Sequence, residues 1–286
     1  MRRIRGLTRL TGRVLLAVLG TGFGCAAYVY LTLPDVRELR TTNPETTAFM
    51  ERRAAEALMD GREPRRAQRW VRYSRISPQL VRAVLVAEDS AFWQHGGVDF
   101  QQIRESLEIN LERMEFARGA STITQQLAKN LYLSPSKNPL RKAKELLIAR
   151  RLEAELTKRR ILELYLNVIE WGEGIYGAEA ASRRYFGRAA AELGPSESAL
   201  LAAAIINPRV LDPARPGTRL RRRQQMILQR MGAAVPPPAL ADGASPTENE
   251  APAMPPPEGP PIVLPGRVLP GGEPPASRGP GGASGS

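Results

Sequence analysis

Three stretches in the middle of the chain decide the fold and hold its least ordinary residue choices. They read EDSAFWQHGGVDF at residues 88–100, GASTITQQLAKN at 119–130 and NPLRKAKELLIARRLE at 138–153. The block of residues 88–153 that spans these stretches contains the single histidine, His95, and four of the five lysines, whereas arginine supplies nearly all positive charge elsewhere. We therefore expect the chemistry of the protein to lie in this block.

Apolar residues around the block recur mainly at helical spacing, and no convincing run alternates as a strand would. Capping residues and first-turn prolines mark the expected helix starts. These are Ser77–Pro78, Asp99, Asn138–Pro139, Thr157 and Gly194–Pro195. Gly172, Gly174 and Gly177 predict a turn before residues 178–186. The sequence thus predicts an all-α or nearly all-α domain.

The expected domain, residues 34–234, lies between two segments of different composition. Residues 14–33 read VLLAVLGTGFGCAAYVYLTL without a charge, which suits a helix crossing a hydrocarbon core of about 30 Å. The arginines in residues 1–13 place the N-terminus in the cytoplasm and the domain outside. A cleaved signal peptide is the alternative, but the apolar stretch exceeds the usual core of about 7 to 15 residues. Residues 235–286, rich in Pro, Gly, Ala and Ser, are expected to be disordered.

The charge and cysteine content exclude some classes of site. A net charge of +12 suits either nucleic acid or an anionic membrane surface, and charge alone does not choose between them. The lone Cys25 excludes an intramolecular disulfide and a cysteine metal site. Because the chain has no second histidine beside His95, we expect neither a zinc site built on two histidines nor a catalytic triad.

Glu88 is the candidate general base. The apolar stripe Leu80, Val81, Val84 and Leu85 continues at helical spacing to Glu88, so its carboxylate should point inward. Burial and the negative end of the helix dipole both disfavour ionisation and should raise its pKa. The alternative is a structural glutamate neutralised by a buried arginine.

The residues after Glu88 predict a supporting loop. Asp89 aligns with Arg82 and is expected to be a supporting or solvent-facing acid. Gly96–Gly97 permit positive φ and close approach of the backbone. We assign His95 mainly to holding this loop and Asp99 to capping the next helix, which is expected to reach about Met114.

The second stretch predicts a polar helix face. If it is helical from about Ser121, one face is apolar and the opposite face carries Thr122, Gln125, Gln126 and Lys129. Hydroxyl, amide and ammonium groups at a helix N-terminus suit sugar hydroxyls and phosphate oxygens. The alternative is an ordinary solvated face.

The third stretch supplies a second acid among cations. Arg141 and Glu145 are four residues apart on a face that continues through Ile148, so partial burial is expected. Lys142 and Lys144 add positive charge that would stabilise a departing phosphate group. The alternative is an exposed ion pair worth about 0.2 to 0.5 kcal/mol.

Taken together, the three stretches resemble motifs of the peptidoglycan glycosyltransferases. The motif E-D-x-x-F-x-x-H-x-G-x-D matches Glu88, Asp89, Phe92, His95, Gly97 and Asp99. The motif G-x-S-T-I-x-Q-Q-x-x-K-N matches Gly119, Ser121, Thr122, Ile123, Gln125, Gln126, Lys129 and Asn130. R-K-x-x-E matches Arg141, Lys142 and Glu145, and a fourth motif matches Ile161 to Asn167 and Tyr176 to Phe186. The resemblance covers about Met50 to Pro216 and is to the monofunctional biosynthetic type.

The resemblance implies a lysozyme-like, two-lobed helical fold at the bacterial inner membrane, with the domain in the periplasm. It implies lipid II and a growing glycan strand as substrates, and it leaves cell-wall synthesis proteins open as partners. Glu88 would deprotonate the acceptor 4-hydroxyl, and Lys129, Arg141, Lys142 and Glu145 would lie near the pyrophosphate. No cofactor is required by the sequence, although Glu145 is a candidate to orient a divalent Mg or Mn ion there.

Two further features stand beside the resemblance. Relatives often have a proline before Asn207–Pro208, where this chain has Ile206. Residues 111–118, LERMEFAR, form a candidate mobile flap or lipid-contacting segment, or else an ordinary surface loop.

The sequence also has three rival functional interpretations. A lysozyme-like hydrolase or lytic transglycosylase also uses paired acids, but it needs no cationic pyrophosphate site. A membrane-anchored, non-catalytic glycan-binding scaffold is the second. Nucleic-acid binding is disfavoured by the outside orientation and the lack of a recognised motif.

Overall fold

The computed structural model describes residues 16–17, 19–24, 27–99, 104, 121–133 and 139–233, and within them the chain is mainly helical, as predicted. The helices are α2 (Ala48–Met59), α3 (Pro78–Glu88), α5 (Ile123–Tyr132), α6 (Pro139–Glu155), α7 (Lys158–Val168), α8 (Ala178–Phe186), α9 (Pro195–Ala204) and α10 (Thr218–Ala233). Short 3-10 turns are η1 (Arg37–Arg40), η2 (Tyr73–Arg75) and η3 (Ala190–Glu192).

Most predicted helix starts that fall on described residues are confirmed. The Ser77 hydroxyl accepts from the Gln79 amide and Pro78 is the first helical residue of α3. Thr157 caps α7 by accepting from the Arg160 amide, and α9 begins at Pro195. The helix predicted after Asp99 and the candidate flap at residues 111–118 lie outside the described residues.

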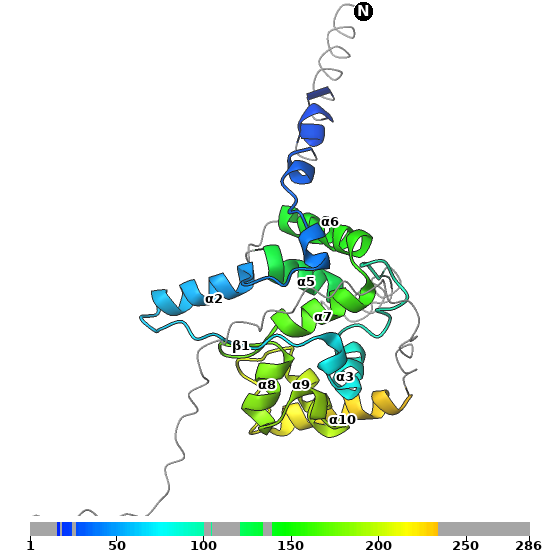
Figure 1. The fold of residues 1–286 in the computed structure, drawn as a ribbon. Helices are drawn as coiled ribbons and strands as arrows, with labels where there is room; N and C mark the ends of the chain where they lie inside the picture. Colours follow the sequence, from blue (N-terminus) through cyan, green and yellow to red (C-terminus); the bar gives the residue numbers. More distant parts are fainter. Residues whose placement is uncertain are drawn as a thin grey trace, which may run out of the picture.

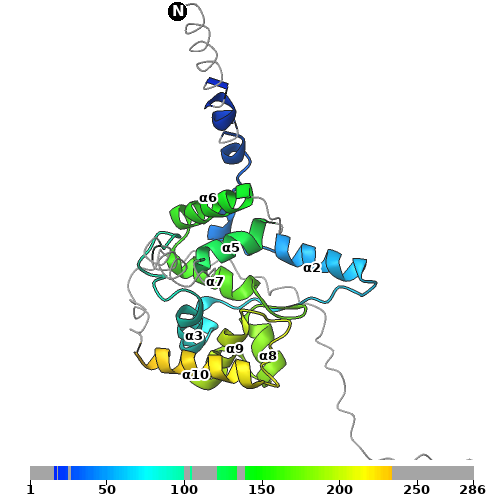
Figure 2. The same ribbon diagram turned by 180° about the vertical axis from the view of Figure 1, so that it is seen from behind.

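The helices form two groups that share one hydrophobic core. In one group α5 contacts α2, α6 and α7; in the other α3, α9 and α10 contact one another. Figures 1 and 2 place α5, α6 and α7 above α3, α8, α9 and α10 in both views. Leu80, Leu127, Leu162 and Leu201 belong to the continuous buried core. This arrangement fits the predicted two-lobed helical domain.

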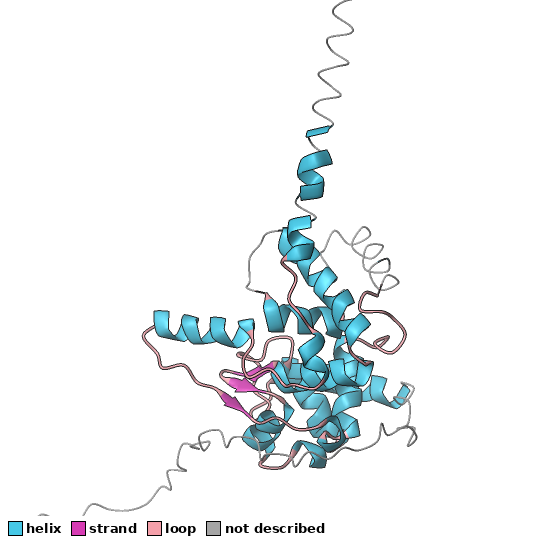
Figure 3. Ribbon diagram, turned by 45° about the horizontal axis from the view of Figure 1, so that its top comes forward, coloured by secondary structure: helices cyan, strands magenta, loops and turns pink. Residues whose placement is uncertain are grey.

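A small three-stranded sheet makes the domain nearly all-α rather than all-α. Its strands are β1 (Ala67–Gln68), β2 (Glu170–Gly172) and β3 (Ile175–Tyr176), in the order β1-β3-β2. Strand β3 pairs parallel with β1 and antiparallel with β2 (Figure 3). Strands of two or three residues are too short to show alternation in the sequence. The predicted glycine turn lies between β2 and β3. Glycine is required there, because Gly174 has a φ of +69° and a Cβ on it would come within 2.7 Å of the Arg65 carbonyl oxygen.

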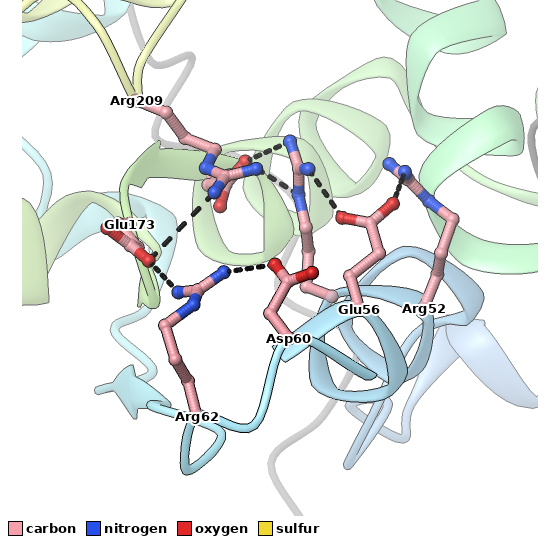
Figure 4. A network of polar contacts seen from close by, with 8 residues as sticks. Arg52, Glu56, Asp60, Arg62, Glu173 and Arg209 are labelled. Carbon is pink, nitrogen blue, oxygen red and sulfur yellow. Dashed lines mark hydrogen bonds and ion pairs between the residues drawn. The ribbon is translucent and has the colours of Figure 1, made fainter. Parts of the chain in front are cut away.

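An ion-pair network holds α2 and the loop after it against this sheet (Figure 4). Arg53 on α2 binds the buried Glu170 of β2 at 2.9 Å and Glu56 at 2.8 Å. Arg62 joins Asp60 to Glu173 in the β2–β3 turn. Burial raises the pKa of Glu170, and Arg53 opposes that shift. Because the buried Glu170 carboxylate is paired with Arg53, the network stabilises the packing of α2 against the sheet.

The N-terminal segment enters the domain beside α6 (Figures 1 and 2). Residues 27–31 are helical. Among the described residues, no helix is both long and apolar enough to cross a bilayer. The predicted anchor at residues 14–33 falls only partly on described residues, so it stays a prediction.

Candidate active site

Glu88 is the last residue of α3, at the end of the predicted apolar stripe. Leu80, Val81, Val84 and Leu85 are all buried, and the Glu88 side chain is 13% exposed. Burial is the largest influence on its carboxyl group and raises the pKa. The prediction of an inward acid with a raised pKa is therefore confirmed.

Each carboxylate oxygen of Glu88 has its own partner. The side-chain nitrogen of Gln126, on α5, donates to Oε2 at 3.0 Å. The guanidinium of Arg223, on α10, lies 3.5 Å from Oε1. Both partners lower the pKa and so oppose the effect of burial. Glu88 thus combines desolvation with two contacts that favour the anion, a combination suited to a base.

Arg223 was not predicted from the sequence, because the resemblance to the glycosyltransferase motifs covers the chain only as far as about Pro216. A signal was present in the spacing of α10. Leu220, Ile227 and Met231 form its buried stripe, and Arg223 lies three residues after the first of them. A residue at that spacing borders the inner face of the helix. The alternative interpretation of Glu88 requires an arginine beside it, and Arg223 occupies that position.

Gln126 is itself held by a buried tyrosine. The Tyr165 hydroxyl, on α7, lies 2.9 Å from Gln126 Oε1 and donates to it. Burial raises the pKa of Tyr165 well above 10, so the hydroxyl keeps its proton. With its oxygen occupied in this way, the Gln126 amide presents its nitrogen to Glu88. Sequence reasoning did not assign Tyr165 to the site.

Asp89 is buried rather than solvent-facing, and it joins the loop to α5. Its Oδ1 contacts His95 Nε2 at 2.9 Å, and its Oδ2 accepts from the Ile123 amide at 2.9 Å. The Gly97 amide donates to His95 Nδ1, so the ring proton is on Nε2 and points to Asp89. The supporting roles predicted for Asp89 and His95 agree with these contacts. Asp99 is half-buried at the end of the described loop.

Two of the four residues on the predicted polar face of α5 are buried. Thr122 is the N-cap of α5, is fully buried and donates to the Gly97 carbonyl. Gln125 is 1% exposed, and its side-chain nitrogen has no partner among the described residues. The pattern misled because α5 is enclosed by α2, α6 and α7, so its polar face also lies inside the domain. Of the four, only Lys129 is exposed.

The second acid, Glu145, is the centre of a cation cluster. It is 4% exposed, more buried than predicted. Arg141 approaches its Oε2 at 3.3 Å, and the Lys142 ammonium donates to its Oε1. Lys142 also reaches Ser121 Oγ at 3.2 Å and Gln125 Oε1 at 3.4 Å. One lysine therefore ties α6 to the N-terminal end of α5.

Lys129 is electrostatically linked to both acids. Desolvation lowers its pKa, Glu145 and Glu88 raise it, and Arg141 and Lys142 lower it. Its ammonium therefore lies within the field of Glu88 on one side and of the Glu145 cluster on the other. The structure brings together the predicted acids and cations around α5.

The described residues offer little for a divalent cation. Among them no group of three or more His, Cys, Asp or Glu side chains gathers as metal ligands would. Both oxygens of Glu145 already contact cationic side chains. This carboxylate is arranged to orient Arg141 and Lys142, and it does not by itself fit a Mg or Mn site.

Comparison with known proteins adds an independent finding. A family model described as transglycosylase matches residues 55–232, which extends the sequence resemblance through α10. A biosynthetic peptidoglycan transglycosylase of Laribacter hongkongensis is 48% identical over 189 residues, 66% of this chain and 83% of that protein. A protein with the same description from Azoarcus sp. is 44% identical over 236 residues, 82% of this chain and all of that protein. One from Aromatoleum aromaticum is 52% identical over 167 residues, 58% of this chain and 73% of that protein.

Proposed function

Because this chain belongs to the transglycosylase family, we propose that it polymerises lipid II into linear β-1,4-linked glycan strands in cell-wall biosynthesis. The observation that carries the proposal is that Glu88 and Glu145 both act electrostatically on Lys129 of α5. One acid is half-buried and partnered by Gln126, and the other is surrounded by cations. The two environments suit two different steps of one transfer reaction.

Glu88 acts as the base. Its carboxylate takes the proton from the 4-hydroxyl of the acceptor GlcNAc while that oxygen attacks C1 of the donor MurNAc. The C1–oxygen bond to the diphosphate breaks with inversion, and its electron pair leaves with undecaprenyl diphosphate. Gln126 and Arg223 fix the carboxylate and favour its ionised form. A carboxylate whose pKa lies above its ordinary value accepts the proton more readily.

The cluster around Glu145 receives the departing diphosphate. Lys129, Arg141 and Lys142 supply fixed positive charge where negative charge develops. Ser121, at the N-terminal end of α5, completes the binding surface, while the buried Thr122 caps α5 and the buried Gln125 accepts from Lys142 and so supports that surface from inside. Glu145 keeps Arg141 and Lys142 in place, so it acts on the reaction through them. Any divalent Mg or Mn ion is proposed only as a counter-ion carried by the diphosphate.

The setting proposed for this reaction is the outer face of the bacterial inner membrane. A lipid-linked substrate requires an enzyme held at the same surface, which the uncharged segment at residues 14–33 would provide as a single-pass anchor. The growing strand and the membrane are the proposed partners, together with other cell-wall synthesis proteins.

Purified full-length protein in detergent, given labelled lipid II, tests the proposal. We expect labelled polymer that a muramidase digests, together with released undecaprenyl diphosphate. A hydrolase would instead shorten preformed glycan and leave lipid II unchanged. A non-catalytic scaffold would do neither, and either of those outcomes would overturn the proposal.

A further inference from the structure

A shallow hollow next to the proposed base is lined by arginines and apolar side chains. It has a volume of about 370 Å³ and is formed by the start of α10 and the segment after α9. Its lining residues are Ile206, Leu211, Arg219, Arg222, Arg223 and Met226. Ile206 is the residue that stands where relatives often have proline, and it is 44% exposed.

Two of the three arginines that line this hollow have no ion-pair partner among the described residues. Arg219 lies three residues before Arg222 and four before Arg223, so the like charges occupy one helix face and repel one another. Helix α10 contains no acidic residue, and Arg219 lies in its first turn, where the helix dipole disfavours a cation. Among the described residues, neither Arg219 nor Arg222 forms an ion pair. A bound anion would relieve this repulsion.

Arg223 connects the hollow to the proposed reaction centre. It lines the hollow and also lies 3.5 Å from Glu88 Oε1. Inversion at C1 requires the attacking hydroxyl to approach opposite the departing diphosphate. Since the cation cluster for the diphosphate involves α5 and α6, the acceptor approaches from the side of α3 and α10. The hollow therefore borders the acceptor sugar rather than the leaving group.

The position of α10 argues against a membrane surface as the occupant. Figures 1 and 2 show α10 at the end of the domain opposite the N-terminal segment and α6. An anchor at residues 14–33 would hold the other end of the domain against the bilayer. Helix α10, which lines the hollow, consequently lies at the end of the domain away from the lipid headgroups.

From these observations we propose that the hollow is an anion subsite for the peptide carried by the acceptor sugar. Arg219 and Arg222 bind its carboxylates, while Ile206, Leu211 and Met226 contact its aliphatic side chains. The inference rests on the proposed function, because it takes the substrate to be a peptide-bearing glycan. Guanidinium groups suit carboxylates through paired N–H donors.

Calorimetry with two soluble ligands tests the subsite on the full-length protein in detergent. The ligands are a GlcNAc–MurNAc disaccharide that carries its peptide and the same disaccharide without it. We expect the peptide to tighten binding to wild type, and Arg219→Gln/Arg222→Gln to remove about five- to tenfold of that gain, as two exposed charged contacts would. Arg215→Gln/Arg230→Gln removes the same charge outside the hollow and should bind like wild type.

Three results would overturn the subsite. The first is equal affinity of the wild type for both disaccharides, and the second is an equal loss of affinity in the two double variants. The third is that heparin binds the wild type as tightly as the peptide-bearing disaccharide does and loses as much affinity in Arg219→Gln/Arg222→Gln. The last would make the hollow a general polyanion surface. Polymerisation of lipid II is measured separately, so a protein that makes no polymer but binds as expected would refute the proposed function and leave the carboxylate subsite standing.

Discussion

The Tyr165 hydroxyl donates to the side-chain oxygen of Gln126 at 2.9 Å, and this contact determines which end of the amide faces Glu88. Were the amide reversed, its oxygen would face a carboxylate and repel it. A buried residue on α7 thereby fixes a hydrogen-bond donor for the proposed base on α3. Tyr165 is in this sense a positioning residue, since it acts through Gln126.

Replacing Tyr165 with phenylalanine should raise the pKa of Glu88, because the Gln126 amide loses its fixed orientation. The acid limb of kcat/KM against pH is expected to move upward by up to about one pH unit, with the rate near wild type at high pH. Tyr176→Phe alters an equally buried tyrosine away from Glu88 and should leave the profile unchanged. A uniform loss at every pH in Tyr165→Phe would contradict the positioning role.

Asp89→Asn should weaken the joint between the loop and α5. The substitution cannot accept from both His95 and the Ile123 amide in the observed arrangement, and it leaves one buried donor unsatisfied. We expect a loss of about 1 to 3 kcal/mol in the free energy of unfolding, measured by urea denaturation. Glu63→Gln, at an exposed acid outside this loop, is the control. Equal stability of the two variants would refute the role given to Asp89.

Lys142→Gln should impair transfer more than binding of the acceptor. Lys142 supplies charge for the diphosphate and links Glu145 to α5, so we expect kcat/KM to fall about 10- to 100-fold with lipid II. Arg150→Gln, at an exposed position on the same helix, should stay within about twofold of wild type. A comparable loss in both variants would point to general surface charge instead of the cluster.

The main helices were predictable because their local signals agree with their environments. The stripe from Leu80 to Glu88 is buried as its spacing indicates, and Ser77 and Thr157 cap their helices through their own hydroxyls. The sequence also indicated both acids, because Glu88 and Glu145 lie at helical spacing from buried apolar residues and fall in the matched motifs. These features depend on neighbours within one or two helical turns.

The missed features depend on contacts between distant segments. Arg223 and Tyr165 meet the site from α10 and α7, and no local pattern reports which side chains tertiary packing brings together. The burial of Thr122 and Gln125 was not predictable, because the enclosure of α5 by three helices is not visible in its own periodicity. The small sheet was missed because its strands are too short to alternate.

Glu88→Gln should stabilise the protein at neutral and higher pH relative to wild type. Burial raises the pKa of Glu88, so the folded state binds this proton more tightly than the unfolded state does. The stability that the group contributes is complete below the unfolded pKa and is lost as pH rises through the folded pKa. Thermal unfolding at pH 4 and pH 8 should show the advantage of Glu88→Gln only at pH 8. An equal difference at both values would contradict the raised pKa.

The most direct test of the central claim is the rate of lipid II polymerisation by Glu88→Gln. Glutamine preserves the shape of the side chain and its contact with α5 but cannot accept the proton. If Glu88 is the base, the variant bound to saturating lipid II should lose at least about 100-fold in kcat, whereas Glu63→Gln, at an exposed acid, keeps the wild-type rate. Polymerisation by Glu88→Gln at a rate near that of wild type would contradict the claim.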